Sequence, residues 1–192
     1  CWQVSIDEMS GVDLAMDHLF SLGHRHIAMI GGRNHVKSTY DKRMRYKTIL
    51  RRHGITFRDR YVPESDYDIE GGYTCMNQLF DTNRTMPTAV IAINDFSAVG
   101  VMRSVKERGL RIPEDMAIVS FDNTFLVDTV LPSLTSVCYD YRVFGKALID
   151  TAVKLINGEE VPTVQKISSR LIVRNSTAKT VSDSSRETMR EE

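Results

Sequence analysis

Long apolar runs are absent from this 192-residue chain, and none approaches the roughly 20 residues that a helix needs to cross a bilayer. An excess of charge of one sign is absent too, since 25 Lys and Arg residues balance 25 Asp and Glu residues. Balanced charge provides no electrostatic footprint for DNA or for an anionic membrane. The chain therefore has the composition of an ordinary globular protein of one or two domains.

Cysteine is scarce and scattered. Cys1, Cys75 and Cys138 form no C-x-x-C pair and no Cys/His spacing of the kind that holds zinc. Isolated thiols are typical of a reducing compartment, so we expect a cytoplasmic protein. The chain begins with Cys-Trp-Gln rather than Met and has no charged-then-apolar leader, which indicates a piece of a longer protein or a processed N-terminus.

The motifs of common enzymes and cofactor-binding proteins are missing as well. Gly31-Gly32 belongs to neither GxGxxG nor GxxxxGK[ST], no GxSxG occurs, and the five histidines show no HExxH spacing. The sequence also shows no plausible nucleophile or acid/base pair. We therefore predict that the protein is not an enzyme and holds no metal or cofactor.

What the sequence does contain is a regular alternation of apolar strand-like runs with helical patterns that end at Gly or Asn. Such alternation is typical of an α/β fold, with a parallel sheet and helices on both faces. Strands are expected at 3–6, 27–30, 61–62, 89–93, 116–121, 136–139, 164–168 and 171–173, and helices at 11–22, 38–53, 69–80, 96–108 and 141–156.

Three further expectations concern the second half of the chain. Residues 124–136 contain Pro132 and no clean period, which predicts a loop with one helical turn. From Ser176 onward the chain is rich in Ser, Thr and charge, which predicts a mobile tail. The helix over 141–156 is expected to turn one face inward, formed by Phe144, Ala147, Leu148, Thr151 and Leu155.

Polar residues stand where two of the expected strands stop. Asn94-Asp95 follows the run 89–93, and Asp122-Asn123 follows the run 116–121. In an open parallel sheet, ligands bind just outside the carboxyl ends of strands, so Asn94 and Asp122 are candidates to face one crevice. An amide and a carboxylate suit a ligand rich in hydroxyl or polar NH groups. The competing interpretations are structural: Asp95 as the cap of the next helix, and Asp122 as a turn residue.

Positive charge is concentrated on the helix expected at 38–53. A solvated face is a more common use of such a helix than a phosphate-binding groove, and we favour it here. The cluster comprises Lys37, Lys42, Arg43, Arg45, Lys47, Arg51 and Arg52.

Four motifs, in this order, resemble the effector-binding core of the lactose-repressor/galactose-repressor family of bacterial transcription regulators. They are HLFSLGHRHIAMIGG at 18–32, PTAVIAINDFSAVGVMRSVKERGLRIPEDMAIVSFDN at 87–123, LPSLTSV at 131–137 and LIVRNST at 171–177. The resemblance covers about residues 4 to 177. It implies a fold similar to periplasmic binding proteins: two α/β subdomains joined by three crossing strands, with the ligand between them.

The resemblance also implies a domain organisation. Residues 1–7 would be a crossing strand and remnant of the N-terminal subdomain, and 8–136 the complete C-terminal subdomain. Residues 137–175 would be the returning helix and strands of the N-terminal subdomain, and 176–192 a flexible tail. The first half of the N-terminal subdomain and the DNA-reading helix-turn-helix would be missing.

Five site residues follow from the resemblance, position by position. Asn94 and Asp122 fall on ligand-contacting positions, Tyr67 on an aromatic position that often stacks on a sugar or base, and Asp7 beside the cleft. Lys42 stands where the family usually has Arg, which keeps the charge but loses the two-pronged fork, and the bulky Arg45 replaces a usual Gly.

The resemblance implies an effector-sensing domain. It would bind a small molecule that favours closure of the two subdomains. A sugar is the first expectation and a nucleoside or purine the second. A homodimer is expected, with operator DNA bound only through the missing N-terminal domain and no membrane partner. The alternatives are an extracytoplasmic sugar-binding protein of a transport system and, third, a sugar or nucleoside transferase on a similar sheet.

Overall fold

A computed structural model describes residues 2–83 and 85–178, and its centre is a five-stranded sheet in the order β2-β3-β4-β5-β7. The first four strands are parallel and β7 is antiparallel to β5. This confirms the predicted α/β class. The strands are β2 Ile27–Ile30, β3 Ala89–Ala92, β4 Ala117–Asp122, β5 Thr135–Tyr139 and β7 Ser169–Ile172.

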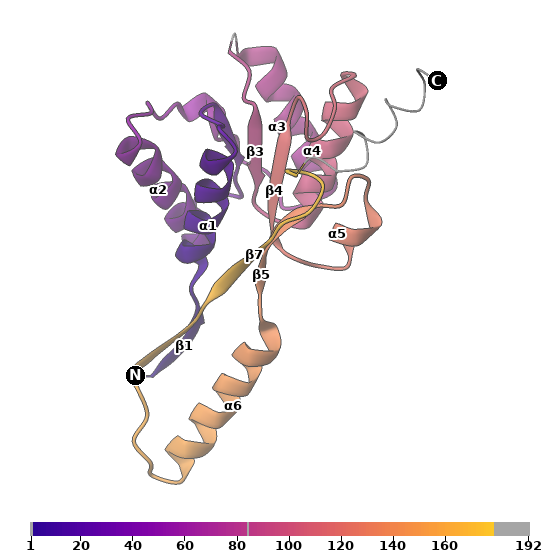
Figure 1. Cartoon of the computed structure of the whole chain (residues 1–192). Coiled ribbons are helices and arrows are strands. Elements are labelled where there is room, and N and C mark those ends of the chain that lie inside the picture. The colour runs from indigo at the N-terminus through magenta and orange to yellow at the C-terminus, as the bar shows by residue number, and fades with distance from the viewer. Residues whose placement is uncertain (1, 84, 179–192) are drawn as a thin grey trace.

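Helices cover both faces of this sheet (Figure 1). Successive strand residues point to opposite faces, so Ile27 and Met29 pack with one helix pair while Ala28 and Ile30 pack with the other. The first pair is α1 Glu8–Ser21 with α2 Lys37–Arg52, and the second is α3 Ile69–Thr82 with α4 Asp95–Glu107.

The helices α3 and α4 approach each other very closely, and glycine makes this possible. A Cβ atom at Gly100 would collide with the backbone of Ile69 and Tyr73, and one at Gly72 would collide with the backbone of Ser97. Backbone atoms cannot move aside as a flexible side chain can. Glycine at these two positions is therefore required for the close packing of α3 on α4.

A smaller unit projects from the sheet (Figure 1). It contains β1 Gln3–Ile6, paired in parallel with β6 Val164–Ile167, and the long helix α6 Tyr141–Ile156. Of the five residues expected to form the inner face of this helix, only Ala147 is buried, and Leu148 is 41% exposed. That expectation is wrong for the described chain, because β1 is the main element against which α6 packs.

Two boundaries differ from those expected at the start of the chain and in its middle. Helix α1 begins at Glu8 rather than after Ser10, because Asp7 is its cap: Asp7 Oδ1 accepts from Ser10 N at 3.3 Å. The strand expected at 61–62 is wrong. Residues Asp59–Tyr61 form a short 3-10 helix, η1, and the only pairing nearby is an isolated bridge between Gly31 and Glu64.

The end of the described chain is built into the sheet. The loop after β4 has the expected single turn, α5 Leu126–Thr129. Ser176 is fully buried, with its Oγ donating to Ile118 O at 2.6 Å and accepting from Thr135 N at 2.8 Å, and Thr177 is buried beside it. The expectation of a mobile tail is therefore wrong for Ser176 and Thr177. The rest of that tail, 179–192, lies outside the described residues.

Candidate functional site

The carboxyl ends of β3 and β4 lie at one edge of the sheet, and the residues that follow them differ in what they contact. Asn94 ends β3 as the N-cap of α4: its Oδ1 accepts from Ser97 N at 2.8 Å. Its amide Nδ2 donates to Tyr67 O at 2.8 Å. Asn94 therefore ties the Tyr67 segment to the start of α4, and it performs the capping that was expected of Asp95.

Asp95 points instead into the protein. It is fully buried, and its Oδ2 accepts from Thr124 N at 2.6 Å. Its Oδ1 accepts from the hydroxyls of Ser120 and Ser136, and Ser136 Oγ in turn accepts from Asn123 N at 3.1 Å. A buried carboxylate without a cation is stable only when donors satisfy it. Here the three donors are Ser120 of β4, Thr124 of the turn after β4, and Ser136 of β5.

The backbone of that turn is strained. Asp122 has φ +95° and Asn123 has φ +52°, and Tyr67 has φ +66°. These three are the non-glycine residues with positive φ among the residues described, and each such conformation costs on the order of 1–3 kcal/mol. Strain that persists at one edge of a sheet needs surrounding contacts to hold it, and Asp95 provides them for Asp122 and Asn123.

The Asp122 side chain has a different environment from that of Asp95. No hydrogen-bond donor among the described residues reaches its carboxylate, which leaves both oxygens available. Partial burial, and then the nearby Asp95 carboxylate, raise the pKa of Asp122 to about 6, with Glu8 adding to the rise and Lys42 opposing it. A partly desolvated carboxylate without donors is poised to accept hydrogen bonds from a ligand.

Asp122 lines an open hollow of about 590 Å³ at the carboxyl ends of β4 and β5. Its wall continues into the first turn of α6, so Tyr139, Asp140 and Tyr141 lie in it as well. The volume is in the range of small-molecule sites. The remaining lining residues are Asn123, Thr124, Cys138, Arg142 and Arg170.

Lys42 is buried between a carboxylate and two aromatic rings. Its Nζ lies 2.8 Å from Glu8 Oε2, 5.2 Å from the centroid of the Phe121 ring and 6.0 Å from that of Tyr139. The side chain is only 8% exposed. Arg45, the other departure from the family pattern, pairs through two bonds of 2.7 and 2.6 Å with Asp13. The ammonium group of Lys42 is thus held in place by Glu8 and lies over the rings of Phe121 and Tyr139.

Tyr67 and Asp7 are held mainly by contacts within the protein. The Tyr67 hydroxyl bonds to Thr39 Oγ1 at 2.8 Å, and its ring lies so close to Gly32 that a side chain there would collide with it. Asp7 caps α1, and its carbonyl accepts from Ser169 Oγ at 2.7 Å. Of the five predicted site residues, the structure places only Asp122 on the wall of the hollow, while Asn94 and Tyr67 contact each other.

Several residues of this edge were missed by the sequence analysis. Tyr139-Asp140-Tyr141 follows β5 just as Asn94-Asp95 follows β3, so the same rule, applied to one more strand, would have found them. Glu8 is adjacent to the predicted Asp7. Arg170 has no such signal, because it comes from the antiparallel strand β7.

Other functional classes find little support in the described part of the chain. No group of three His, Cys, Asp or Glu side chains there could hold a metal ion, and no helix there is long and apolar enough to span a bilayer. Four of the seven cations of the basic cluster form ion pairs, and among these Lys37 is exposed whereas Lys42 is buried, so a solvated face describes the cluster only in part. Cys75 and Cys138 are buried free thiols, and burial raises the pKa of Cys75 to about 11. Cys1 lies outside the described residues.

Comparison with known proteins agrees with this arrangement. Residues 16–177 match the periplasmic binding protein-like domain family. Catabolite control protein A of Priestia megaterium is 32% identical over 176 residues, which cover 91% of this chain and 53% of that protein. The chain spans about half the length of the curated relatives it matches.

Two solved structures are similar over most of the chain. The transcriptional regulator CelR in complex with cellobiose is 28% identical, with a TM-score of 0.83, covering 91% of this chain and 54% of that one. The lac repressor dimer bound to operator and the anti-inducer ONPF is also 28% identical, with a TM-score of 0.83, covering 91% and 60%.

Proposed function

The chain belongs to the periplasmic binding protein-like family and forms part of the effector-binding core of a LacI-family (lactose-repressor/galactose-repressor) regulator, and on this premise we propose that it senses a small polar molecule. The effector binds at the carboxyl ends of β3, β4 and β5. The observation that carries the proposal is the Asp122 carboxylate, which is partly buried, has no donor among the described residues and lines the hollow.

A sugar is the effector class that suits this edge best. A carboxylate with two free oxygens accepts hydrogen bonds from vicinal hydroxyls. Tyr139 and the more exposed Tyr141 line the same hollow, and the Lys42 ammonium lies 6.0 Å from the centroid of the Tyr139 ring. Asn94 would act from the neighbouring strand end. The cellobiose bound by CelR supports this class. A nucleoside or purine is the second candidate, since the same groups can stack on and hydrogen-bond to a base. Tyr67 and Asp7 would act at the edge of this site.

We infer the following organisation for the whole protein. Residues 8–136 form one subdomain, and 1–7 with 137–175 contribute crossing strands and the helix α6 to a second. The effector bridges the two and favours their closed arrangement, which it can do only by binding that arrangement more tightly than the open one. The longer protein acts in the cytoplasm as a homodimer and reaches operator DNA through a separate N-terminal domain.

The transport-protein alternative shares the fold and the ligand class. The similarity to transcription regulators rather than to transport proteins favours the sensor. An enzymatic role is the third alternative, and the transcription regulators named above lend it no support. Incubation with candidate sugars and nucleosides, followed by a search for turnover, tests that role.

The experiment that tests the proposal is a ligand screen on the full-length protein with sugars and nucleosides, read out as a rise in melting temperature. We expect at least one sugar to stabilise the protein, and Asp122→Asn to abolish this while keeping the fold, because Asn tolerates positive φ but loses the charge. Asp17→Asn removes the same charge from an exposed position of α1 and should leave the response unchanged. Wild-type ligand affinity in Asp122→Asn would refute the assignment.

A further inference from the structure

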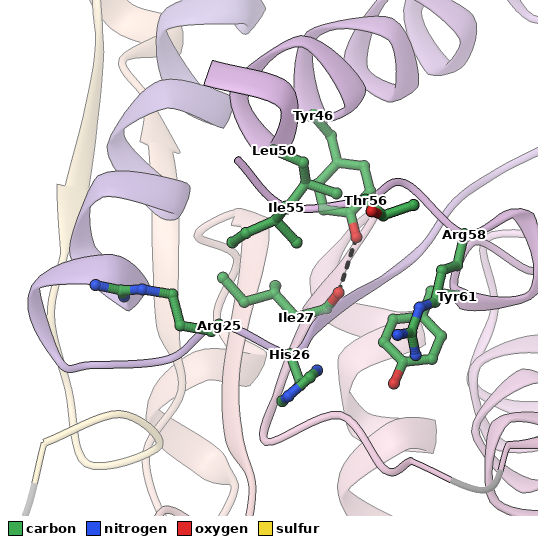
Figure 2. A pocket seen from close by; sticks show the side chains of 9 residues that line it. All are labelled: Arg25, His26, Ile27, Tyr46, Leu50, Ile55, Thr56, Arg58 and Tyr61. Carbon is green, nitrogen blue, oxygen red and sulfur yellow. Dashed lines mark hydrogen bonds between the residues drawn. The ribbon is translucent and has the colours of Figure 1, made fainter. Parts of the chain in front are cut away.

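A second hollow lies at the amino end of β2, away from the strand ends that form the effector edge. Its volume is about 220 Å³, and it is lined by residues from the start of β2, the C-terminal half of α2 and the segment 55–61 (Figure 2). Figure 2 shows Ile55 and Leu50 on one side of the space and Arg58 with Tyr61 on the other. The volume is below the usual range for drug-sized ligands and suits a small metabolite.

The floor of this hollow is apolar and fixed. Ile27, Tyr46 and Leu50 are each less than 5% exposed. The Tyr46 hydroxyl donates to Ile27 O at 2.8 Å, which holds its ring against the strand (Figure 2). The Tyr61 hydroxyl donates to Thr85 O at 2.6 Å. Both tyrosine protons are therefore engaged, and the rings present hydrocarbon surface to the space between them.

Arg58 supplies a positive charge that no carboxylate pairs with in the part of the chain that the structure describes. Its guanidinium lies over the Tyr61 ring at 5.5 Å from the centroid, and its Nη1 is buried with no acceptor among the described residues. The neighbouring carboxylate along the chain, Asp59, is paired with Arg43 at 2.9 Å instead. A buried cationic N–H without an acceptor is destabilising, and an incoming anion that supplies the acceptor would relieve this.

The rest of the lining adds no negative charge. Arg25 and His26 stand at the rim, and no Asp or Glu is among the lining residues. The Arg25 guanidinium donates to Phe20 O and His24 O and points away from the space in Figure 2, so Arg58 is the donor that faces it. The hollow thus combines a guanidinium that has no carboxylate partner among the described residues with an apolar floor.

We propose that this hollow is a second binding site, distinct from the effector edge, for a small carboxylate that carries a compact apolar body. The carboxylate accepts from the Arg58 guanidinium, and the apolar body lies on Ile27, Leu50 and Ile55. The fork of an arginine matches a carboxylate, and a charge-assisted hydrogen bond of this kind is about twice as strong as a neutral one.

Benzoate titrated into the ¹⁵N-labelled 192-residue chain tests the proposal, with amide shifts as the readout. Saturable shifts are expected at Ile27, Ile55 and Arg58. Benzyl alcohol, which keeps the ring but not the charge, and inorganic phosphate, which keeps the charge but not the ring, should each bind roughly tenfold more weakly or worse. Arg58→Gln should weaken benzoate binding by a similar factor, and Arg58→Lys by less, since Lys keeps the charge.

Arg60→Gln is the matched control, because Arg60 is exposed, is two residues away and does not line the hollow. It should bind benzoate as the wild type does. The absence of saturation, equal affinity in Arg58→Gln, or phosphate bound as tightly as benzoate would each overturn the proposal. If the amide signals of β4, which is remote from the hollow, change throughout in Arg58→Gln, that variant has not folded. The benzoate and benzyl alcohol titrations of the wild type and Arg58→Lys then test the proposal.

Discussion

The ends of β3 and β4 carry the same kind of sequence, an Asn and an Asp after a buried apolar run, yet the structure uses them in opposite ways. After β3, both oxygens of Asp95 and both ends of the Asn94 amide are bonded within the protein. After β4, the Asp122 carboxylate has no donor among the described residues and lines an open hollow. The residues after β3 are bonded within the protein, and those after β4 include the acceptor that we propose for the effector.

The difference comes from what lies beside each strand end. Asp95 begins a helix that packs over the sheet, so its side chain meets Ser120 of β4 and Ser136 of β5. Asp122 ends its strand with φ +95°, and its side chain lines the hollow instead of meeting these hydroxyls. The strained turn that frees Asp122 is itself held by Asp95 through Thr124 and, by way of Ser136, Asn123.

Asp95→Ala should have the largest effect on this arrangement. The change leaves the Ser120 and Ser136 hydroxyls and the Thr124 amide without their acceptor in a buried site, and we expect a loss of about 3–5 kcal/mol in the free energy of unfolding. Urea unfolding followed by circular dichroism measures this. Asp95→Asn keeps two acceptor lone pairs and should lose less. A loss below about 1 kcal/mol for Asp95→Ala would mean that the β3 end is not what holds the turn.

Asn94→Ala should have the next largest effect, because it removes a helix cap and the bond to Tyr67 O together. We expect a loss of about 1–2 kcal/mol in the free energy of unfolding. Asn94→Ser is the matched variant: it restores a capping oxygen but not the bond to Tyr67, and it should recover about half of that loss. The same urea titration compares the three proteins. Equal stability of the wild type and Asn94→Ala would contradict the structural role given to this side chain.

The sequence predicted the position of both strand ends, because hydrophobic periodicity and an abrupt polar stop are local signals. It did not predict that Asp95 would be buried and hydrogen-bonded while the Asp122 carboxylate would lack a donor. Asp95 and Ser136 are 41 residues apart, and their contact depends on β4 and β5 being neighbours in the sheet. The cap was assigned to Asp95 because Asp and Asn are equally good caps, and only the extended backbone of Asn94 decides between them.

The face of α6 shows a second limit of the same kind. Its apolar periodicity correctly predicted a helix, which Asp140 caps by accepting from Val143 N. Periodicity says which side chains would be buried against a partner, but not whether the described chain supplies that partner. Ser176 and Thr177 show the reverse. Small polar residues of this kind are typical of mobile tails, but here these two are buried and form specific hydrogen bonds to Thr135 and Ile118.

The last expected effect, similar in size to that of Asn94→Ala, is on the pH dependence of stability, and it compares the two aspartates directly. Burial, and then Asp95, raise the pKa of Asp122 from its ordinary value to about 6 in the folded state, so between pH 4 and pH 6 the folded protein binds more protons at this group than the unfolded chain does. Stability contributed by Asp122 is therefore present at low pH and is lost as the pH rises through this window, by about 1–2 kcal/mol after allowance for its partial exposure. Asp122→Asn should flatten the curve of unfolding free energy between pH 4 and pH 7 and be at least as stable as the wild type at pH 7. Urea titrations at a series of pH values measure the two curves. Parallel curves for the wild type and Asp122→Asn would show that this carboxylate is as well satisfied as that of Asp95, and the contrast between the two strand ends would not hold.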